Sequence, residues 1–271
     1  MTIPRLALAA LAATMLVAPP AAQAAPKAQL IARWQQSGTG LAVDYAGWGA
    51  FLDRYGSRLA GGRTVLAYGR VSAADKAALS ATVSHLAAID VDRLTRVQQH
   101  AYWINLYNAL TIQVVLGAYP VSSILNIKDG LFPTGPWDRK VVTVKGMTLS
   151  LNDIEHGILR PIFRDPRTHF AINCASVGCP NLALTPYEAS RLDAQLDAAA
   201  RGYVNDPRGF RLKGTRLIAS QIFDWYGVDF GGPKGVLGFA RRFADAGTAR
   251  MLGNRATIDG YDYDWSLNEA R

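Results

Sequence analysis

The stretch TRVQQHAYWINLYNALTIQVVLGAYP, residues 95–120, decides much of the fold because it predicts one long buried helix. Thr95 is a favourable N-cap, and Pro120 ends the pattern. Asn105 and Asn108 lie three positions apart on a shared face of this helix. Apolar residues beside them recur every three or four positions, as on a core-facing stripe: Trp103, Leu106, Leu110 and Val114.

The rest of the sequence predicts short helices and paired strands around this helix. Helices are expected from Ala73 to about Ala88, from Asn152 to Arg160 with a stop at Pro161, from Thr185 to about Arg201 and from Gly235 to Leu252. Strand pairs are expected around Lys145-Gly146 and Lys213-Gly214, with a buried strand from His169 to Cys174 and an edge strand from Tyr261 to Leu267. The pattern predicts an α+β fold, a small and mostly antiparallel sheet surrounded by helices.

Composition bounds the function. The chain has 271 residues, of which 49% are hydrophobic and 18% charged, so it can bury a sizeable core. Lys and Arg total 29 against 21 Asp and Glu, but the basic residues form no run. A nucleic-acid partner is therefore not indicated.

Residues 1–24 resemble an export signal. Arg5 supplies a positive start, an apolar run extends from Leu6 to Val17, and Ala22-Gln23-Ala24 is a small-x-small cleavage site. We expect cleavage after residue 24, one globular domain over 25–271, and a periplasmic or secreted protein. The apolar stretch 101–118 contains Asn and Gln side chains, which are costly in lipid, so no stable membrane insertion is expected after cleavage.

Four ordered motifs resemble the domain-of-unknown-function family 547 over roughly residues 90–230. They are YWINLYNAL at 102–110, IEHGILR at 154–160, NCASVGCP at 173–180 and IFDWY at 222–226. The resemblance implies a bacterial exported form of a domain that is also seen within larger plant and nematode proteins. A distant similarity to papain-like or transglutaminase-like thiol enzymes is a further expectation, although here the cysteine follows the candidate histidine.

The third motif contains a candidate nucleophile. Cys174 precedes a run of small residues, 175–178, whose backbone amides could face a bound oxyanion. His156 is the preferred base, and the adjacent Glu155 is a candidate proton acceptor or orienting group. His169 is the poorer base, since five residues of extended strand would place it about 16 Å from Cys174.

Other polar residues are candidates for substrate binding: Arg160, Asn105, Asn108 and Ser176. Arg160 suits bidentate recognition of a carboxylate, with an ion pair to an Asp as the alternative. An amide such as Asn105 or Asn108 either satisfies loop backbone groups or polarises a substrate carbonyl.

The two cysteines permit other interpretations. A Cys174–Cys179 disulfide suits an exported protein, and a redox pair is a third possibility, although the C-x4-C spacing differs from that of thioredoxin-like sites. Zinc held by both cysteines with His156 and His169 is disfavoured by the spacing. No metal and no cofactor are expected.

Two functions follow from these residues. The first is an exported thiol-dependent hydrolase or acyl/amide transferase that acts on a peptide-like substrate. The alternative is a non-catalytic periplasmic module that binds a small peptide or anion and contains a Cys174–Cys179 disulfide. The sequence favours no particular oligomeric state.

Overall fold

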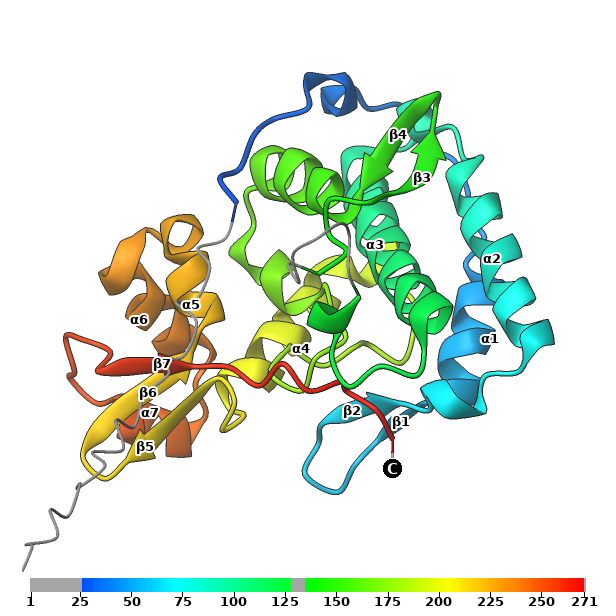
Figure 1. Ribbon diagram of the computed structural model, residues 1–271. Helices are drawn as coiled ribbons and strands as arrows, with labels where there is room; N and C mark the ends of the chain where they lie inside the picture. Colours follow the sequence, from blue (N-terminus) through cyan, green and yellow to red (C-terminus); the bar gives the residue numbers. More distant parts are fainter. Residues whose placement is uncertain (1–25, 128–134, 271) are drawn as a thin grey trace, which may run out of the picture.

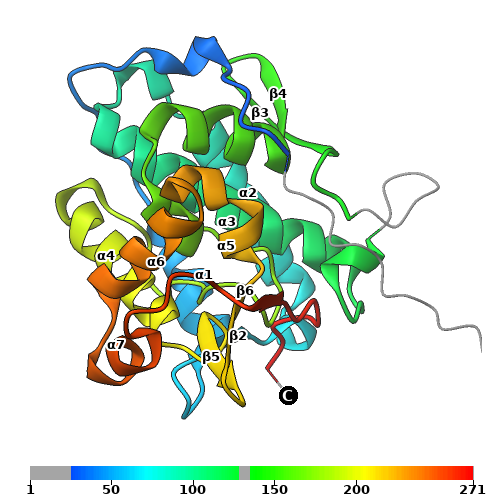
Figure 2. The ribbon, with the colours of Figure 1, turned by 90° about the vertical axis from the view of Figure 1, so that its left-hand side faces the viewer.

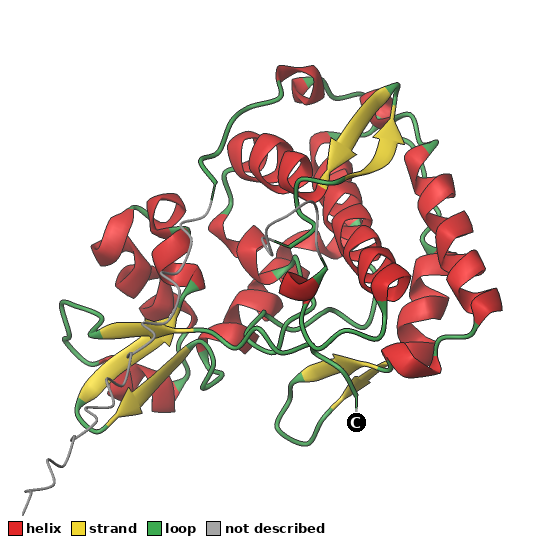
Figure 3. Ribbon diagram, viewed as in Figure 1, coloured by secondary structure: helices red, strands yellow, loops and turns green. Residues whose placement is uncertain are grey.

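The computed structural model describes residues 26–127 and 135–270. The predicted export signal lies outside these residues. The α+β class is confirmed, but the strands form three small sheets instead of one (Figures 1 and 3). Within the described residues, no helix is long and apolar enough to cross a membrane.

The predicted long helix is α3, Arg96–Ala118, and it is the centre of the larger core. Thr95 and Gln98 form a capping box at its start, in which each side chain bonds the other residue's backbone N–H. Almost every side chain of α3 from Gln99 to Leu116 is buried, because other elements cover it on all sides. The elements of this half are α1 (Ala46–Tyr55), α2 (Ala73–Ala87), β1 (Gly56–Arg58), β2 (Thr64–Leu66), β3 (Lys140–Val144) and β4 (Met147–Ser150).

A second hydrophobic core is built from the C-terminal half of the chain. Its elements lie beside the α1–α3 half in Figure 1 and in front of it in Figure 2. Its elements are α4 (Leu192–Val204), β5 (Phe210–Lys213), β6 (Arg216–Ser220), α5 (Ile222–Trp225), the 3-10 helix η8 (Gly227–Phe230), α6 (Gly232–Phe243), α7 (Ala246–Leu252) and β7 (Gly260–Asp262). Strand β6 pairs antiparallel with β5 and parallel with β7. The predicted helix from Gly235 to Leu252 is thus two helices, because Asp245 caps a new one.

Both predicted hairpins form. Lys145 and Gly146, between β3 and β4, both have positive φ, as a tight two-residue turn requires. The chain between β5 and β6 turns at Gly214, which also has positive φ.

The helix predicted from Thr185 begins later. Its first helical residues are Ala189–Arg191, a short 3-10 turn, followed by α4 from Leu192. Tyr187 is held out of the helix because Asn105 bonds both its backbone N–H and its carbonyl, at 2.9 and 2.8 Å. The tertiary contact with Asn105 has therefore delayed the start of the helix that the local sequence predicts at Thr185.

The helix predicted to stop at Pro161 instead continues to Phe163 as the π-helix η5, Asp153–Phe163. Pro161 leaves one bond of the helix unmade because it has no N–H, and the helix ends two residues later.

The predicted strand from His169 to Cys174 is also wrong. His169 lies in the 3-10 helix η6, Pro166–Phe170, and residues 171–174 form irregular chain without a strand partner. His169 is therefore not separated from Cys174 by the five residues of extended strand that predicted a distance of about 16 Å.

Candidate active site around Cys174

Three side chains surround the sulfur of Cys174, and we call the four residues the thiol centre: Cys174, Cys179, Ser176 and Tyr263. The Cys174 sulfur lies 2.6 Å from the Cys179 sulfur, 3.0 Å from the Tyr263 hydroxyl and 3.2 Å from the Ser176 hydroxyl. Both cysteines are free thiols. Cys174 is partly exposed, whereas Cys179 is 4% exposed. The pair is therefore asymmetric, with one cysteine residue partly exposed and the other buried.

Helix α3 fixes the chain that leads into this centre. The Asn108 side chain donates to the Ala171 carbonyl at 2.9 Å and accepts from the Asn173 backbone N–H at 2.8 Å. Asn173 in turn accepts from the Ala175 N–H and donates to the Pro180 carbonyl. These bonds hold Ala175 at a φ of 60°, a strained conformation for a residue with a Cβ.

The C-terminal segment clamps the cysteine loop from the other side. The Val177 N–H donates to the Ser266 carbonyl and the Gly178 N–H to the Asp264 carbonyl, both at 2.7 Å. Figure 1 shows this segment in red, running from β7 past the loop towards β2. The same path delivers Tyr263 to the thiol centre.

The backbone amides of residues 175–178, which the sequence suggested as donors to an oxyanion, mostly form hydrogen bonds within the protein. The N–H groups of Ala175, Val177 and Gly178 all donate to protein acceptors. The backbone N–H of Ser176 bonds Cys174. An attacked carbonyl would therefore find few free donors in this loop.

Hydrogen bonds set the charge state of the pair. Burial by itself raises the pKa of a thiol, but hydrogen bonds from Cys179, Ser176 and Tyr263 outweigh it and lower the pKa of Cys174. Burial and the neighbouring Cys174 charge raise the pKa of Cys179 well above its usual range. The thiolate therefore forms more readily at Cys174 than at Cys179.

A second polar cluster lies between the two cores, and we call it the acid–imidazole centre: Glu155, His156, Arg160, His169 and Asp229. Asp229 accepts from Arg160 Nε at 2.6 Å and contacts His169 Nε2 at 2.8 Å. Arg160 also lies 3.1 Å from His156 Nδ1. Glu155 is 3.9 Å from the same nitrogen, too far for a hydrogen bond. Arg160 thus forms an ion pair with Asp229, the alternative to carboxylate recognition that the sequence left open.

Burial keeps His156 neutral. Desolvation is the largest cause of its lowered pKa, and the Arg160 charge adds to it. Burial alone would raise the pKa of Glu155, but the nearby imidazoles and hydrogen bonds from Tyr226 and Tyr107 lower it. The centre therefore holds an ionised carboxylate beside a neutral imidazole.

Two tyrosines contact the acid–imidazole centre. Tyr107 donates to Glu155 at 2.9 Å, and Tyr226 stacks on His169 with ring centroids 4.1 Å apart. The Cys174 charge contributes to the raised pKa of both phenols, after burial and Glu155. Among the described residues, however, Cys174 and His156 share no hydrogen bond.

Several of these residues had no signal in the sequence. Tyr263 lies in the alternating tail, and Asp229 follows the last family motif with no pattern of its own.

Asn105 and Asn108, two candidates for substrate binding, instead bond backbone groups of Tyr187, Ala171 and Asn173. No cluster of three or more His, Cys, Asp or Glu that could hold a metal occurs in the described part of the chain.

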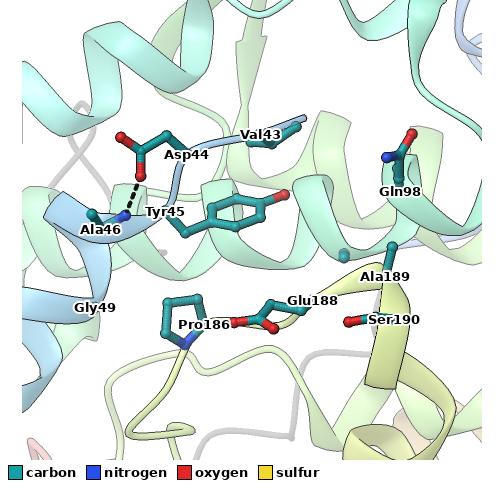
Figure 4. A pocket seen from close by; sticks show the side chains of 11 residues that line it. Val43, Asp44, Tyr45, Ala46, Gly49, Gln98, Pro186, Glu188, Ala189 and Ser190 are labelled. Atoms are coloured by element: carbon teal, nitrogen blue, oxygen red, sulfur yellow. Dashed lines mark hydrogen bonds between the residues drawn. The ribbon is translucent and has the colours of Figure 1, made fainter. Parts of the chain in front are cut away.

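Two hollows of the described surface lie apart from both centres. A groove of about 600 Å³ is lined by residues that include Tyr45, Gln98, Pro186 and Glu188 (Figure 4). A second hollow of about 510 Å³ lies against η8 and includes Val228. Neither is lined by a residue of the thiol centre or of the acid–imidazole centre.

Fold and site together define an α+β protein with a paired-cysteine centre. The predicted resemblance is confirmed, since residues 91–204 match the family described as "Protein of unknown function, DUF547". The match contains three of the four motifs, and the fourth, at 222–226, lies beyond it. No curated protein and no solved structure matches the chain.

Proposed function

We propose that this protein is a thiol-dependent enzyme whose nucleophile is Cys174, and that its reaction is thiol–disulfide exchange with Cys179 as the second thiol. One observation carries the proposal: the sulfur of Cys174, a partly exposed residue with a lowered thiol pKa, lies 2.6 Å from the sulfur of Cys179, a buried residue with a raised thiol pKa. This asymmetry suits an attacking thiolate and a resolving thiol.

The reaction has two steps. The Cys174 thiolate attacks one sulfur of a substrate disulfide, the substrate S–S bond breaks, and the leaving thiolate takes a proton from solvent. Cys179 then loses its proton and attacks the Cys174 sulfur, which releases the second substrate thiol. The substrate disulfide is reduced and the protein dithiol becomes the Cys174–Cys179 disulfide; the reverse sequence oxidises a dithiol substrate.

Acyl or amide transfer by Cys174, with hydrolysis as the variant that uses water, is a second candidate. It is favoured by the acid–imidazole centre, where an imidazole with a lowered pKa lies beside a carboxylate with a lowered pKa. In this reaction His156 would accept the thiol proton, assisted by Glu155. The occupied amides of the cysteine loop make it the weaker candidate.

The compartment and partners are part of the proposal. The export signal expected over residues 1–24 would deliver the domain to the periplasm or the exterior, where disulfides persist. A peptide-like thiol or disulfide is the proposed substrate, with Arg160 available to a carboxylate only if its bond to Asp229 opens. A binding module with a permanently oxidised Cys174–Cys179 pair is the non-catalytic alternative.

Reaction with an aromatic disulfide, dithiobis(nitrobenzoate), separates these functions. We expect the reduced protein to release two aromatic thiolates per chain and retain no adduct, because Cys179 resolves the mixed disulfide. Cys179→Ser should release one and retain the adduct, as intact mass would show. An adduct retained at Cys174 of the unsubstituted protein would overturn the exchange proposal, and a pair that resists reduction in the native state would favour the binding module.

A further inference from the structure

The N-terminal segment lies on the π-helix, and we call residues 26–31 the strap. The Gln29 backbone N–H donates to the His156 carbonyl and the Ile31 N–H to the Gly157 carbonyl, both at 2.9 Å. Arg160 donates to the Pro26 carbonyl at 2.7 Å. Figure 1 shows the strap in blue beside the green η5 helix. All three bonds use main-chain groups of the strap, so its attachment is largely independent of its side chains.

Pro161 explains why helix carbonyls are available to the strap. A helical carbonyl accepts from the N–H four residues on in an α-turn and five residues on in a π-turn. Because η5 is a π-helix, the N–H five residues after His156 would be that of Pro161, which has none. The His156 carbonyl is therefore left for the Gln29 N–H, and the Gly157 carbonyl accepts the Ile31 N–H on one of its two lone pairs.

Gly157 makes the same surface accessible. A Cβ at this position would lie 2.5 Å from Ile31 Cδ1 and 2.7 Å from Ile31 Cγ1. Glycine inside a helix costs about 1 kcal/mol relative to alanine, and here it makes room for an aliphatic side chain of the strap. The strap therefore meets η5 with a fixed spacing: the Pro26 carbonyl, the Gln29 N–H three residues later, and the aliphatic Ile31 two residues after that.

The strap itself is weakly embedded. Residues 26–30 are exposed, with Leu30 at 43%. It is attached to η5 by these three main-chain bonds and by the Ile31 side chain against Gly157. It lies next to Arg160 and His156 of the acid–imidazole centre.

We propose that the carbonyls of His156 and Gly157, with Arg160, form a recognition site for an extended polypeptide backbone, which the strap occupies from within the same chain. A partner peptide binds there when the strap leaves, through the same three main-chain bonds and with an aliphatic side chain against Gly157. This is main-chain recognition of the kind seen when a peptide adds to a sheet edge, transferred to a π-helix. It does not depend on the thiol chemistry.

The test releases the strap without altering the site. Gln29→Pro removes one of the two donors, and Ala28→Pro is the matched control because the Ala28 N–H has no partner among the described residues. Loss of one hydrogen bond should speed amide exchange at Ile31 by about twofold to tenfold. A labelled peptide of residues 26–36 should then bind Gln29→Pro more tightly than the Ala28→Pro protein.

Adding Gly157→Ala to the Gln29→Pro protein should abolish peptide binding, because the new Cβ occupies the place of the aliphatic side chain. Gly202→Ala, in α4 and facing open space, is the matched helical control and should leave binding unchanged. Peptide binding that survives Gly157→Ala, or a released strap with no peptide binding, would overturn the proposal. So would a Gln29→Pro strap that exchanges no faster than that of Ala28→Pro.

Discussion

Asn173 donates its backbone N–H to the side-chain oxygen of Asn108 at 2.8 Å, and this bond joins the central helix to the cysteine loop. Asn108 is 2% exposed, so the bond is fully sheltered from water. Together with the bond from Asn108 to the Ala171 carbonyl, it sets the direction in which the chain enters Cys174. A side chain that the sequence placed beside a core stripe thus positions the proposed nucleophile.

Replacing Asn108 with alanine should destabilise the protein and also slow the thiol. The change leaves two buried backbone groups without partners, which should cost about 2–4 kcal/mol in the free energy of unfolding. Urea denaturation measures this loss, and the alkylation rate of Cys174 in the native state measures the displacement of the loop.

Asn105→Ala is the matched control for this prediction. It also removes two bonds to buried backbone, at Tyr187, and should cost a similar free energy. Because Tyr187 does not contact the thiol centre, the Cys174 rate should remain unchanged. Equal slowing in both variants would assign the effect to general loss of stability.

Removing the hydroxyl donors should make Cys174 less reactive below neutral pH. Tyr263→Phe and Ser176→Ala each delete one bond to the sulfur, so the pKa of Cys174 should rise and its thiolate fraction fall. We expect the alkylation rate there to drop about threefold to tenfold in each variant. At alkaline pH, where the thiol is ionised anyway, the difference should vanish.

Tyr261→Phe controls for the loss of a phenol near the same strand without a bond to Cys174. Its alkylation profile should match that of the unsubstituted protein. A Tyr263→Phe profile that also matches would exclude the phenol as a donor to the thiolate.

Asp229 should make the stability depend on pH in the acid range. Burial tends to raise the pKa of its carboxyl, but hydrogen bonds from His169 and Arg160 lower it to about 2. A depressed folded-state pKa stabilises the fold above the unfolded value of about 4, and this stabilisation, about 2 kcal/mol, is lost as the pH falls towards 2. Asp229→Asn should show a flatter loss over that range, measured by urea denaturation at a series of pH values.

Local patterns predicted the fold well where local forces determine it. The N-cap at Thr95, the helix over Ala73–Ala87 and the hairpin at Lys145-Gly146 all follow from caps and turn conformations. The strand over 169–174 and the helix from Thr185 were wrong because Asn108 and Asn105 bond those segments from α3. Such bonds join residues more than 60 positions apart, and no periodic pattern in the sequence indicates them.

The site was predictable only in part for the same reason. The family motifs contain Cys174, Cys179, Ser176, His156, Glu155 and Arg160, which the structure distributes over two centres. Tyr263 reaches the sulfur from 89 residues away, and Asp229 reaches Arg160 from 69 residues away. Both are brought in by the second core, which the sequence patterns did not separate from the first.

The most direct test of the central claim is the rate at which iodoacetamide alkylates each cysteine of the reduced native protein at neutral pH, read by peptide mass spectrometry. Activation of Cys174 by its three donors predicts that it is alkylated faster than a free cysteine, while Cys179 remains unlabelled until the protein unfolds. Alkylation of Cys174 no faster than free cysteine, or equal labelling of both sulfurs, would contradict the account.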